Sequence, residues 1–179
     1  MSVKITYFVH GTTTDNLNDC STGWLPGELS ELGIKQSKEL KDFADLNNFD
    51  VIFSSDLKRA VDSALLNFGE NAKIIQDERL RECNYGDLNG FPSEKVVDED
   101  HISEPFPNGE SLKDVEKRLR NFCDFLIENY DGKHVAIVAH KAPQLALEVI
   151  ANGKTWEQSL ADDWRKLREW QPGWNYYLS

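Results

Sequence analysis

The chain has 179 residues, of which 40% are hydrophobic and 28% are charged, a composition typical of one soluble domain with a buried core. We therefore expect a single domain over residues 1–179. The formal net charge of −11 argues against nucleic acid and anionic membranes as partners, because both attract basic surfaces.

The chain also lacks the patterns of exported and membrane proteins. No apolar run approaches the ~20 residues that a membrane helix needs, and a strand pattern begins almost at the N-terminus, so we expect neither a membrane span nor a signal peptide. The three cysteines (Cys20, Cys83 and Cys123) are odd in number and lack the spacing of metal ligands. We expect no disulfide framework, no metal, no cofactor and a cytoplasmic location, and the oligomeric state is left open.

Short apolar runs rich in β-branched residues predict strands, and apolar residues at helical spacing predict helices. In chain order, the expected strands cover residues 3–10, 51–53, 73–75, 135–139 and 174–178. The expected helices run from residue 30 to about 47, from 55 or 56 to about 67, from 111 through 126, from just after 143, and from 155 to about 170. Strands that alternate with helices predict an α/β sandwich of three layers, with a mostly parallel central sheet flanked by helices.

Several helix starts carry capping signals. Ser30 is a suitable N-cap, and Ser55 or Asp56 is expected to cap the next helix. Ser111 and Thr155 each begin a capping-box pattern. The apolar residues expected on or near one face of the first helix are Leu32, Leu40, Phe43 and Leu46.

Two segments lack a regular pattern. Residues 11–29 are expected to form a polar loop, and residues 77–110 show no periodicity, whereas residues 172–173 predict a turn. A segment as long as 77–110 in a compact domain is more often functional than idle.

Polar residues follow three of the expected strands where each ends. His10 and His140 are the first polar residues after their strands, and Arg59 follows the strand at 51–53. In an open α/β sheet, ligands bind beyond the carboxyl ends of the strands. Two imidazoles and a guanidinium that converge there can bind a phosphate group and provide a nucleophile. The competing interpretations are a core histidine bonded to the backbone and a solvated arginine on a helix face.

Six segments in the same order resemble those of one family. Residues 10–16 (HGTTTDN) are similar to the first signature of the histidine phosphatase superfamily, an Arg-His-Gly-x-Thr-x-x-Asn pattern. The other similar segments are residues 29–36 (LSELGIKQ), 54–64 (SSDLKRAVDSA), 80–90 (LRECNYGDLNG), 108–111 (NGES) and 138–140 (VAH). The resemblance covers nearly the whole chain and implies a phosphoglycerate-mutase-like fold.

The resemblance implies that His10 is the nucleophile. Independently of it, a neutral imidazole at a strand end can attack phosphorus in line and form a phosphohistidine. The resemblance also implies that Arg59 and His140 bind the phosphoryl group and stabilise the transition state. A guanidinium in the first turn of a helix can bind two phosphate oxygens with support from the helix dipole. Asn16 is expected to donate a further hydrogen bond to phosphate.

Glu82 is the expected general acid, because it fits the similar segment at 80–90. An oxyanion leaving group needs a proton, which a carboxyl can donate before it acts as a base toward the attacking water. Glu78 and Asp87 are local competitors for this role. Each of these carboxylates also has the plain interpretation of a solvated surface charge.

The chain departs from the family pattern at Val9, where the family has an arginine directly before the nucleophile. Losing one transition-state donor costs roughly 10²–10³ in rate unless another group replaces it. Lys141 follows His140 directly, where the family usually has a small residue. We expect Lys141 to bind phosphate as the substitute cation, with a solvated lysine as the alternative.

These residues predict a metal-independent phosphomonoesterase that acts through phospho-His10 on a small phosphorylated metabolite. The alternatives are a phosphoglycerate-type mutase and an impaired phosphate-binding or regulatory protein. Relatives with mutase activity tend to carry a longer insertion beside the active site than residues 77–110 provide. That segment and the C-terminal aromatic residues are expected to shape the pocket, although aromatic residues at such spacing more often belong to a core (Trp164, Trp170, Trp174, Tyr176 and Tyr177).

Overall fold

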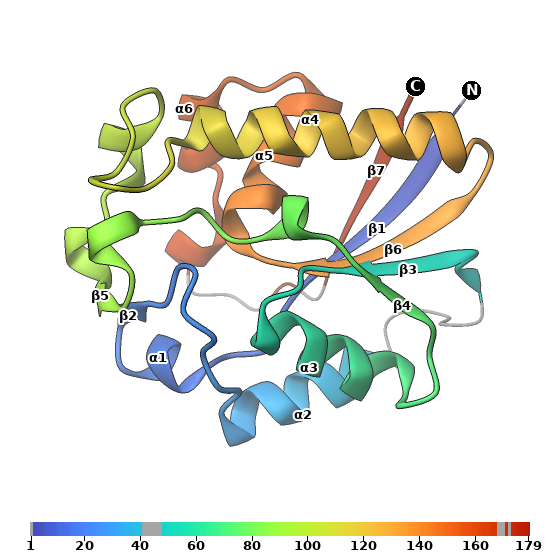
Figure 1. Cartoon of the computed structure of the whole chain (residues 1–179), viewed down its shortest axis with the longest axis horizontal. Helices are drawn as coiled ribbons and strands as arrows, with labels where there is room; N and C mark the ends of the chain where they lie inside the picture. The colour runs from blue at the N-terminus through green and yellow to red at the C-terminus, as the bar shows by residue number, and fades with distance from the viewer. Residues whose placement is uncertain (1, 41–47, 168–170, 172) are drawn as a thin grey trace.

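A computed structural model describes residues 2–40, 48–167, 171 and 173–179 of the chain. Its main sheet has five strands in the order β4-β3-β6-β1-β7, of which the last is antiparallel and the others are parallel (Figure 1). The strands are β1 (Val3–Val9), β3 (Val51–Ser54), β4 (Ile74–Gln76), β6 (His134–Ala139) and β7 (Trp174–Leu178). Each agrees with its predicted strand to within one residue at either end, and β7 lies at one edge of the sheet.

Helices cover both faces of this sheet (Figure 1). One face carries α2 (Glu31–Glu39) and α3 (Lys58–Phe68), and the other carries α4 (Leu112–Asn129), α5 (Lys141–Asn152) and α6 (Trp156–Ala161). Successive side chains of a strand point to opposite faces, so Phe8 packs with Leu40 and Ala64 on one side. On the other side, Tyr7 and Val9 join the larger core. The predicted three-layer α/β sandwich is confirmed. Among the described residues, no helix is long and apolar enough to cross a membrane.

The register of β1 and β6 brings the two predicted histidines together. Val9 pairs with Ala139, and the N–H of His10 donates to the carbonyl of Ala139 at 3.0 Å. In this parallel register, His10 and His140 lie side by side just beyond the two strand ends, with ring centroids 5.1 Å apart. The predicted convergence of the two imidazoles is confirmed.

Three of the predicted helix starts have the expected caps. The hydroxyl of Ser30 accepts the N–H of Gly33 at the start of α2. Ser111 and Thr155 form both hydrogen bonds of a capping box, at the starts of α4 and α6. These caps satisfy backbone N–H groups that have no partner within the helix.

The predicted cap of α3 is wrong. Leu57 occupies its N-cap position and makes no side-chain cap bond. The carboxylate of Asp56 instead accepts hydrogen bonds from Arg81, which belongs to a segment 25 residues away. An ion pair with a distant segment has therefore replaced the local cap.

Two predicted helix boundaries also differ. Helix α5 begins at Lys141, before Pro143, and a proline is tolerated there because first-turn N–H groups have no intrahelical partner. Helix α6 ends at Ala161 rather than near residue 170. The side chain of Asp163 accepts the N–H of Arg165 and opens a separate 3₁₀ turn at Trp164–Leu167.

The predicted apolar face of α2 is only partly correct. Leu40 is buried, but Leu32 is 47% exposed. Gly33 and Ser37 are the buried positions of α2, because this helix lies close against the loop that follows β1. The predicted contributions of Phe43 and Leu46, and Pro172 of the predicted turn, lie outside the described residues.

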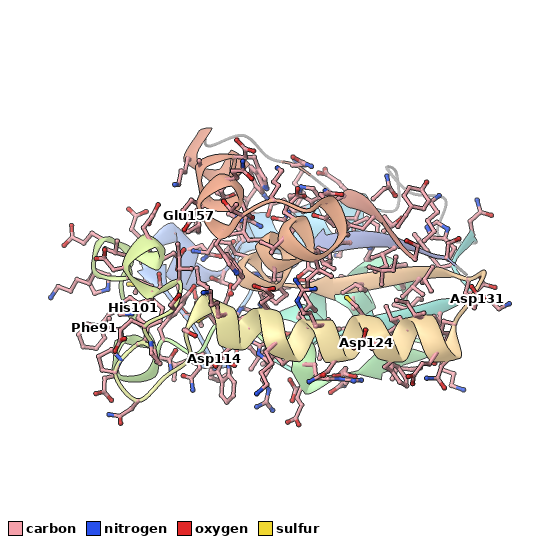
Figure 2. All side chains as sticks on the ribbon, turned by 90° about the horizontal axis from the view of Figure 1, so that it is seen from above. Phe91, His101, Asp114, Asp124, Asp131 and Glu157 are labelled. Carbon is pink, nitrogen blue, oxygen red and sulfur yellow. The ribbon has the colours of Figure 1, made fainter. Side chains whose placement is uncertain are left out.

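The two irregular segments lie at the carboxyl ends of the parallel strands. Residues 11–29 contain a short helix α1 (Thr14–Leu17) and a strand β2 (Cys20–Ser21), neither of which was predicted. Strand β2 pairs with β5 (Phe91–Pro92) of the second segment, which otherwise consists of 3₁₀ turns and loops. Figure 2 shows Phe91 and His101 at one end of the molecule and Asp131, which precedes β6, at the other.

Candidate active site

A cavity of about 340 Å³ lies beyond the ends of β1 and β6. This volume suits a small ligand. The predicted site residues that line it are His10, Asn16, Arg59, Glu82 and Lys141. The structure therefore brings together residues from four separate segments. Val9 and Trp164 also line the cavity.

His10 is held with one ring nitrogen toward the backbone. Its Nδ1 lies 2.7 Å from the carbonyl oxygen of Gly11, and because a carbonyl oxygen only accepts, Nδ1 carries the proton. In the neutral ring, Nε2 then has a lone pair, which accepts a hydrogen bond from Nε of Arg59 at 3.3 Å. Burial and the charge of Arg59 lower the pKa of His10 to about 3. The ring is therefore neutral near pH 7 and has a nucleophilic nitrogen.

His140 lies behind His10 and is fully buried. Its side-chain nitrogens have no hydrogen-bond partner among the residues that the structure describes. The hydroxyl of Tyr7 donates to the carbonyl of His140 at 2.7 Å and accepts its N–H at 3.0 Å, which holds the backbone in place. Burial, with the nearby charge of Arg59, keeps the pKa of His140 well below its usual range. The phosphoryl-binding role of His140 stays a prediction.

Arg59 lies in the first turn of α3 and is almost fully buried. Its Nη1 donates to the carbonyl of Leu25, and its Nη2 donates to the carbonyl of Gly23, both at 2.8 Å. The guanidinium thus fixes the loop of residues 23–26 as well as facing His10 through Nε. The interpretation of Arg59 as a solvated surface charge is wrong, because the side chain is buried. The backbone carbonyls that accept its hydrogen bonds offset the cost of burying the cation.

Glu82 lies at the N-terminus of α5. One carboxylate oxygen accepts the N–H groups of Cys83 and Ala142, both at 2.9 Å, and the other accepts the N–H of Lys141 at 3.2 Å. Three N–H donors hold the carboxylate in a single orientation at the cavity wall. Of its competitors, Glu78 is 77% exposed and Asp87 bonds to Asn108 away from the cavity.

Lys141 is the first residue of α5 and lines the cavity. Its ammonium already has a partner, since Nζ donates to Asp98 at 2.6 Å. Burial acts to lower the pKa of Lys141, but the negative charges of Asp98 and Glu82 outweigh it and hold the pKa above its usual value. The lysine is therefore a cation whose charge is largely balanced, and its contact with phosphate stays a prediction.

Asn16 serves first as a local cap. Its Oδ1 accepts the N–H of Thr13, and its own N–H donates to the hydroxyl of Thr13, both at 3.0 Å. The carboxamide nitrogen is the part of the side chain that this cap does not use. It is available as the predicted donor because Asn16 lines the cavity.

Sequence reasoning missed the residues that support this site from a distance. Trp24 and Arg118 both donate to the carbonyl of Glu82, at 2.7 and 2.9 Å, and Arg118 also pairs with Glu110. Tyr7 and Arg165 were missed as well. No local pattern distinguishes these residues from ordinary core or surface residues. Trp24, Arg118 and Tyr7 bind backbone groups more than 35 residues away in the sequence, and Arg165 lies in a turn that was not predicted.

A comparison with protein families matches residues 7–160 to the histidine phosphatase superfamily (branch 1). The chain belongs to the histidine phosphatase superfamily. The predicted family is therefore confirmed, and the match includes the segments that carry His10, Arg59, Glu82 and His140.

This member of the histidine phosphatase superfamily has relatives of more than one activity. The 2,3-bisphosphoglycerate-dependent phosphoglycerate mutase of Allorhizobium ampelinum is 31% identical over 172 residues, which cover 85% of this chain and 81% of the mutase. Phosphoserine phosphatase 1 of Hydrogenobacter thermophilus is 31% identical over 156 residues, which cover 81% of this chain and 74% of the phosphatase.

Solved structures confirm the phosphoglycerate-mutase-like fold of this chain. A mycobacterial glucosyl-3-phosphoglycerate phosphatase in complex with VO3 matches with a TM-score of 0.75 and 28% identity, over 88% of this chain and 86% of the other. The alpha-ribazole phosphatase of Shigella flexneri matches with a TM-score of 0.78 and 24% identity, over 88% and 84% of the two chains, and supports the fold alone.

Proposed function

We propose that this protein is a metal-independent phosphomonoesterase that hydrolyses a small phosphorylated metabolite through a phosphohistidine at His10. The observation that carries the proposal is the orientation of His10. Its Nδ1–H donates to the carbonyl of Gly11, which leaves Nε2 with a lone pair that accepts only a long hydrogen bond from Arg59 at 3.3 Å, and its lowered pKa keeps the ring neutral. A neutral imidazole with a fixed tautomer is a competent nucleophile toward phosphorus.

The reaction proceeds in two displacements. In the first, Nε2 of His10 forms a bond to phosphorus, the ester P–O bond breaks, and the leaving oxygen takes its electron pair and a proton from the Glu82 carboxyl. In the second, water attacks phosphorus while the Glu82 carboxylate takes a proton from it, and the N–P bond breaks to return the electron pair to His10. Arg59 and His140 stabilise the charge on the phosphoryl oxygens in both steps.

A mutase is the second candidate function, since close relatives include phosphoglycerate mutases. Both reactions begin with the same phosphohistidine and differ in the acceptor, which is water in one and a bound hydroxyl in the other. Incubation of a phosphoglycerate with the protein separates them. Release of inorganic phosphate supports the phosphatase, and an isomeric phosphoglycerate without phosphate release supports the mutase.

The experiment that tests the proposal is the substitution His10→Ala. We expect turnover of 4-nitrophenyl phosphate to fall by roughly 10³-fold or more, because the nucleophile is lost. Rapid quenching of the wild-type protein with labelled substrate should trap an acid-labile phosphoprotein, which the variant should lack. His101→Ala is the matched control, because His101 stacks on Phe106 outside the cavity.

Two results would contradict the proposed mechanism. Turnover by His10→Ala within tenfold of the wild type would exclude the phosphohistidine route. Phosphate binding by the wild type without any turnover would instead favour the phosphate-binding or regulatory alternative.

A further inference from the structure

Most N–H groups of the cations Arg59 and Lys141 at the cavity already have hydrogen-bond acceptors within the protein. A phosphoryl group presents three oxygens and about two negative charges. Both terminal nitrogens of Arg59 donate to backbone carbonyls, and the ammonium of Lys141 donates to Asp98. Val9 contributes no donor. The Nε of Arg59 donates to Nε2 of His10 at 3.3 Å.

Arg165 brings another guanidinium to the cavity wall. Its Nη1 donates to Asp163 at 2.8 Å and to the side-chain oxygen of Gln144 at 3.3 Å. Its guanidinium carbon also lies 5.0 and 5.7 Å from the ring centroids of Trp164 and Trp174. These contacts fix the plane of the guanidinium before any ligand arrives.

The other terminal nitrogen of Arg165, Nη2, differs from Nη1. Nη2 is buried and makes no hydrogen bond to any of the residues that the structure describes. A buried donor on a charged group without an acceptor costs free energy of folding, so such a group calls for an explanation. A ligand oxygen in the adjacent cavity explains it.

We propose that Arg165 is a phosphoryl-binding residue, whose Nη2 donates to a phosphate oxygen and replaces the guanidinium absent at Val9. The inference rests on the proposed function, since it names a ligand of the same site. Val9 and Arg165 line the same cavity as His10. A preorganised guanidinium suits phosphate because its donors are planar and permanently charged.

The position of Arg165 agrees with an action at the reacting group. After burial and Arg59, its charge also contributes to lowering the pKa of His10. Lys141 is placed less well for the same task, since its ammonium is already paired. The cation that compensates for Val9 therefore comes from the C-terminal 3₁₀ turn rather than from the start of α5.

Calorimetric titration with inorganic phosphate, repeated with orthovanadate, tests the proposal without requiring turnover. We expect Arg165→Gln to weaken binding by roughly 10- to 100-fold, the value of one charge-assisted hydrogen bond. The matched control is Lys166→Gln, which removes the same charge from the same turn. Lys166 is exposed and pairs with Glu99, so this variant should bind within about twofold of the wild type.

The outcomes separate the inference from the proposed function. Loss of binding in Arg165→Gln with normal binding in Lys166→Gln supports Arg165, even for a protein that shows no hydrolysis. Phosphate binding by Arg165→Gln within threefold of the wild type overturns the inference. A wild type that binds neither anion overturns both. If Arg165→Gln does not fold, Arg165→Met replaces it, since methionine keeps an unbranched side chain but has neither charge nor donor, and undiminished phosphate binding by that variant overturns the inference.

Discussion

His10 and His140 end neighbouring strands in matching register, but their surroundings differ. His10 is half-buried and lines the cavity, whereas His140 is completely buried behind it. Both imidazoles are neutral, because burial and the charge of Arg59 lower the pKa of each histidine. We therefore expect His10, which lines the cavity, to form the covalent bond, and the buried His140 to act on the phosphoryl group without bonding to it.

Glu82→Gln should slow alkyl phosphates far more than aryl phosphates with acidic phenols. A general acid matters most when the departing oxygen is basic. The amide nitrogen of glutamine cannot accept the N–H bonds that the carboxylate of Glu82 accepts, so we also expect a uniform loss for all substrates. The measurement is kcat/KM against the pKa of the leaving group. A parallel plot for variant and wild type would move the acid role to another residue.

Tyr7→Phe should lower both stability and turnover, because the variant leaves the buried backbone N–H and carbonyl of His140 without their shared partner. An unpaired buried group costs about 1–3 kcal/mol of the free energy of unfolding. Urea unfolding and kcat are the measurements. Tyr177→Phe is the control, since Tyr177 is 64% exposed on β7. Equal unfolding midpoints for the two variants would contradict the positioning role of Tyr7.

The loop that carries His10 depends on its close packing against α2. A Cβ at Gly11 would meet the backbone of Gly33, and a Cβ at Gly33 would meet the backbone of Thr12. The hydroxyl of Ser30 donates to the carbonyl of Thr12 at 2.8 Å and joins the same two segments. This helix and this loop therefore hold the nucleophile in place as one unit.

Gly33→Ala should destabilise the protein by about 1–3 kcal/mol, the usual cost of overpacking. Alanine favours a helix over glycine by about 1 kcal/mol, but the collision with the Thr12 backbone outweighs this gain. The same shift should displace His10 and lower kcat. Urea unfolding and steady-state kinetics are the measurements, with Lys35→Ala at an exposed position of α2 as the control. A more stable Gly33→Ala variant would show that the loop yields without cost.

The stability of the whole molecule should fall as the pH drops below about 6.5. His10 and His140 have lowered pKa values in the folded state, whereas in the unfolded chain they titrate near 6.5. Between these values the unfolded state binds more protons, so stability is present above pH 6.5 and is lost as the pH falls. The slope is at most about 1.4 kcal/mol per pH unit for each histidine.

Urea unfolding between pH 7.5 and 4.5 measures this dependence. Carboxylates with lowered pKa values, such as those of Asp56 and Asp114, begin to lose their contribution only below about pH 5, so the slope above pH 5 reports the histidines. Burial also lowers the pKa of His134, so this histidine contributes to the slope with the same sign. His10→Asn should reduce the slope, because one of the three titrating histidines is removed. A free energy of unfolding that stays constant from pH 7 to 5 would contradict the neutral, buried state of the histidines.

The five strands, the caps at Ser30, Ser111 and Thr155, and the meeting of His10 with His140 were predictable, because each depends on a local pattern or on strand polarity. The predicted cap at Asp56 failed because Arg81, distant in sequence, binds that carboxylate.

The role of Arg165 could not be read from the sequence for the same kind of reason. Its position follows from a helix that ends at Ala161 and from bonds to Gln144 and Asp163, where the local pattern predicts a continuous helix. Hydrophobic periodicity and helix capping depend on residues that are close together in the sequence, so both can be recognised from the sequence alone. Which side-chain N–H groups stay available at the cavity depends on the hydrogen bonds that each side chain makes with distant segments. Those segments come together only in the folded chain, so the sequence alone does not show which donors are left.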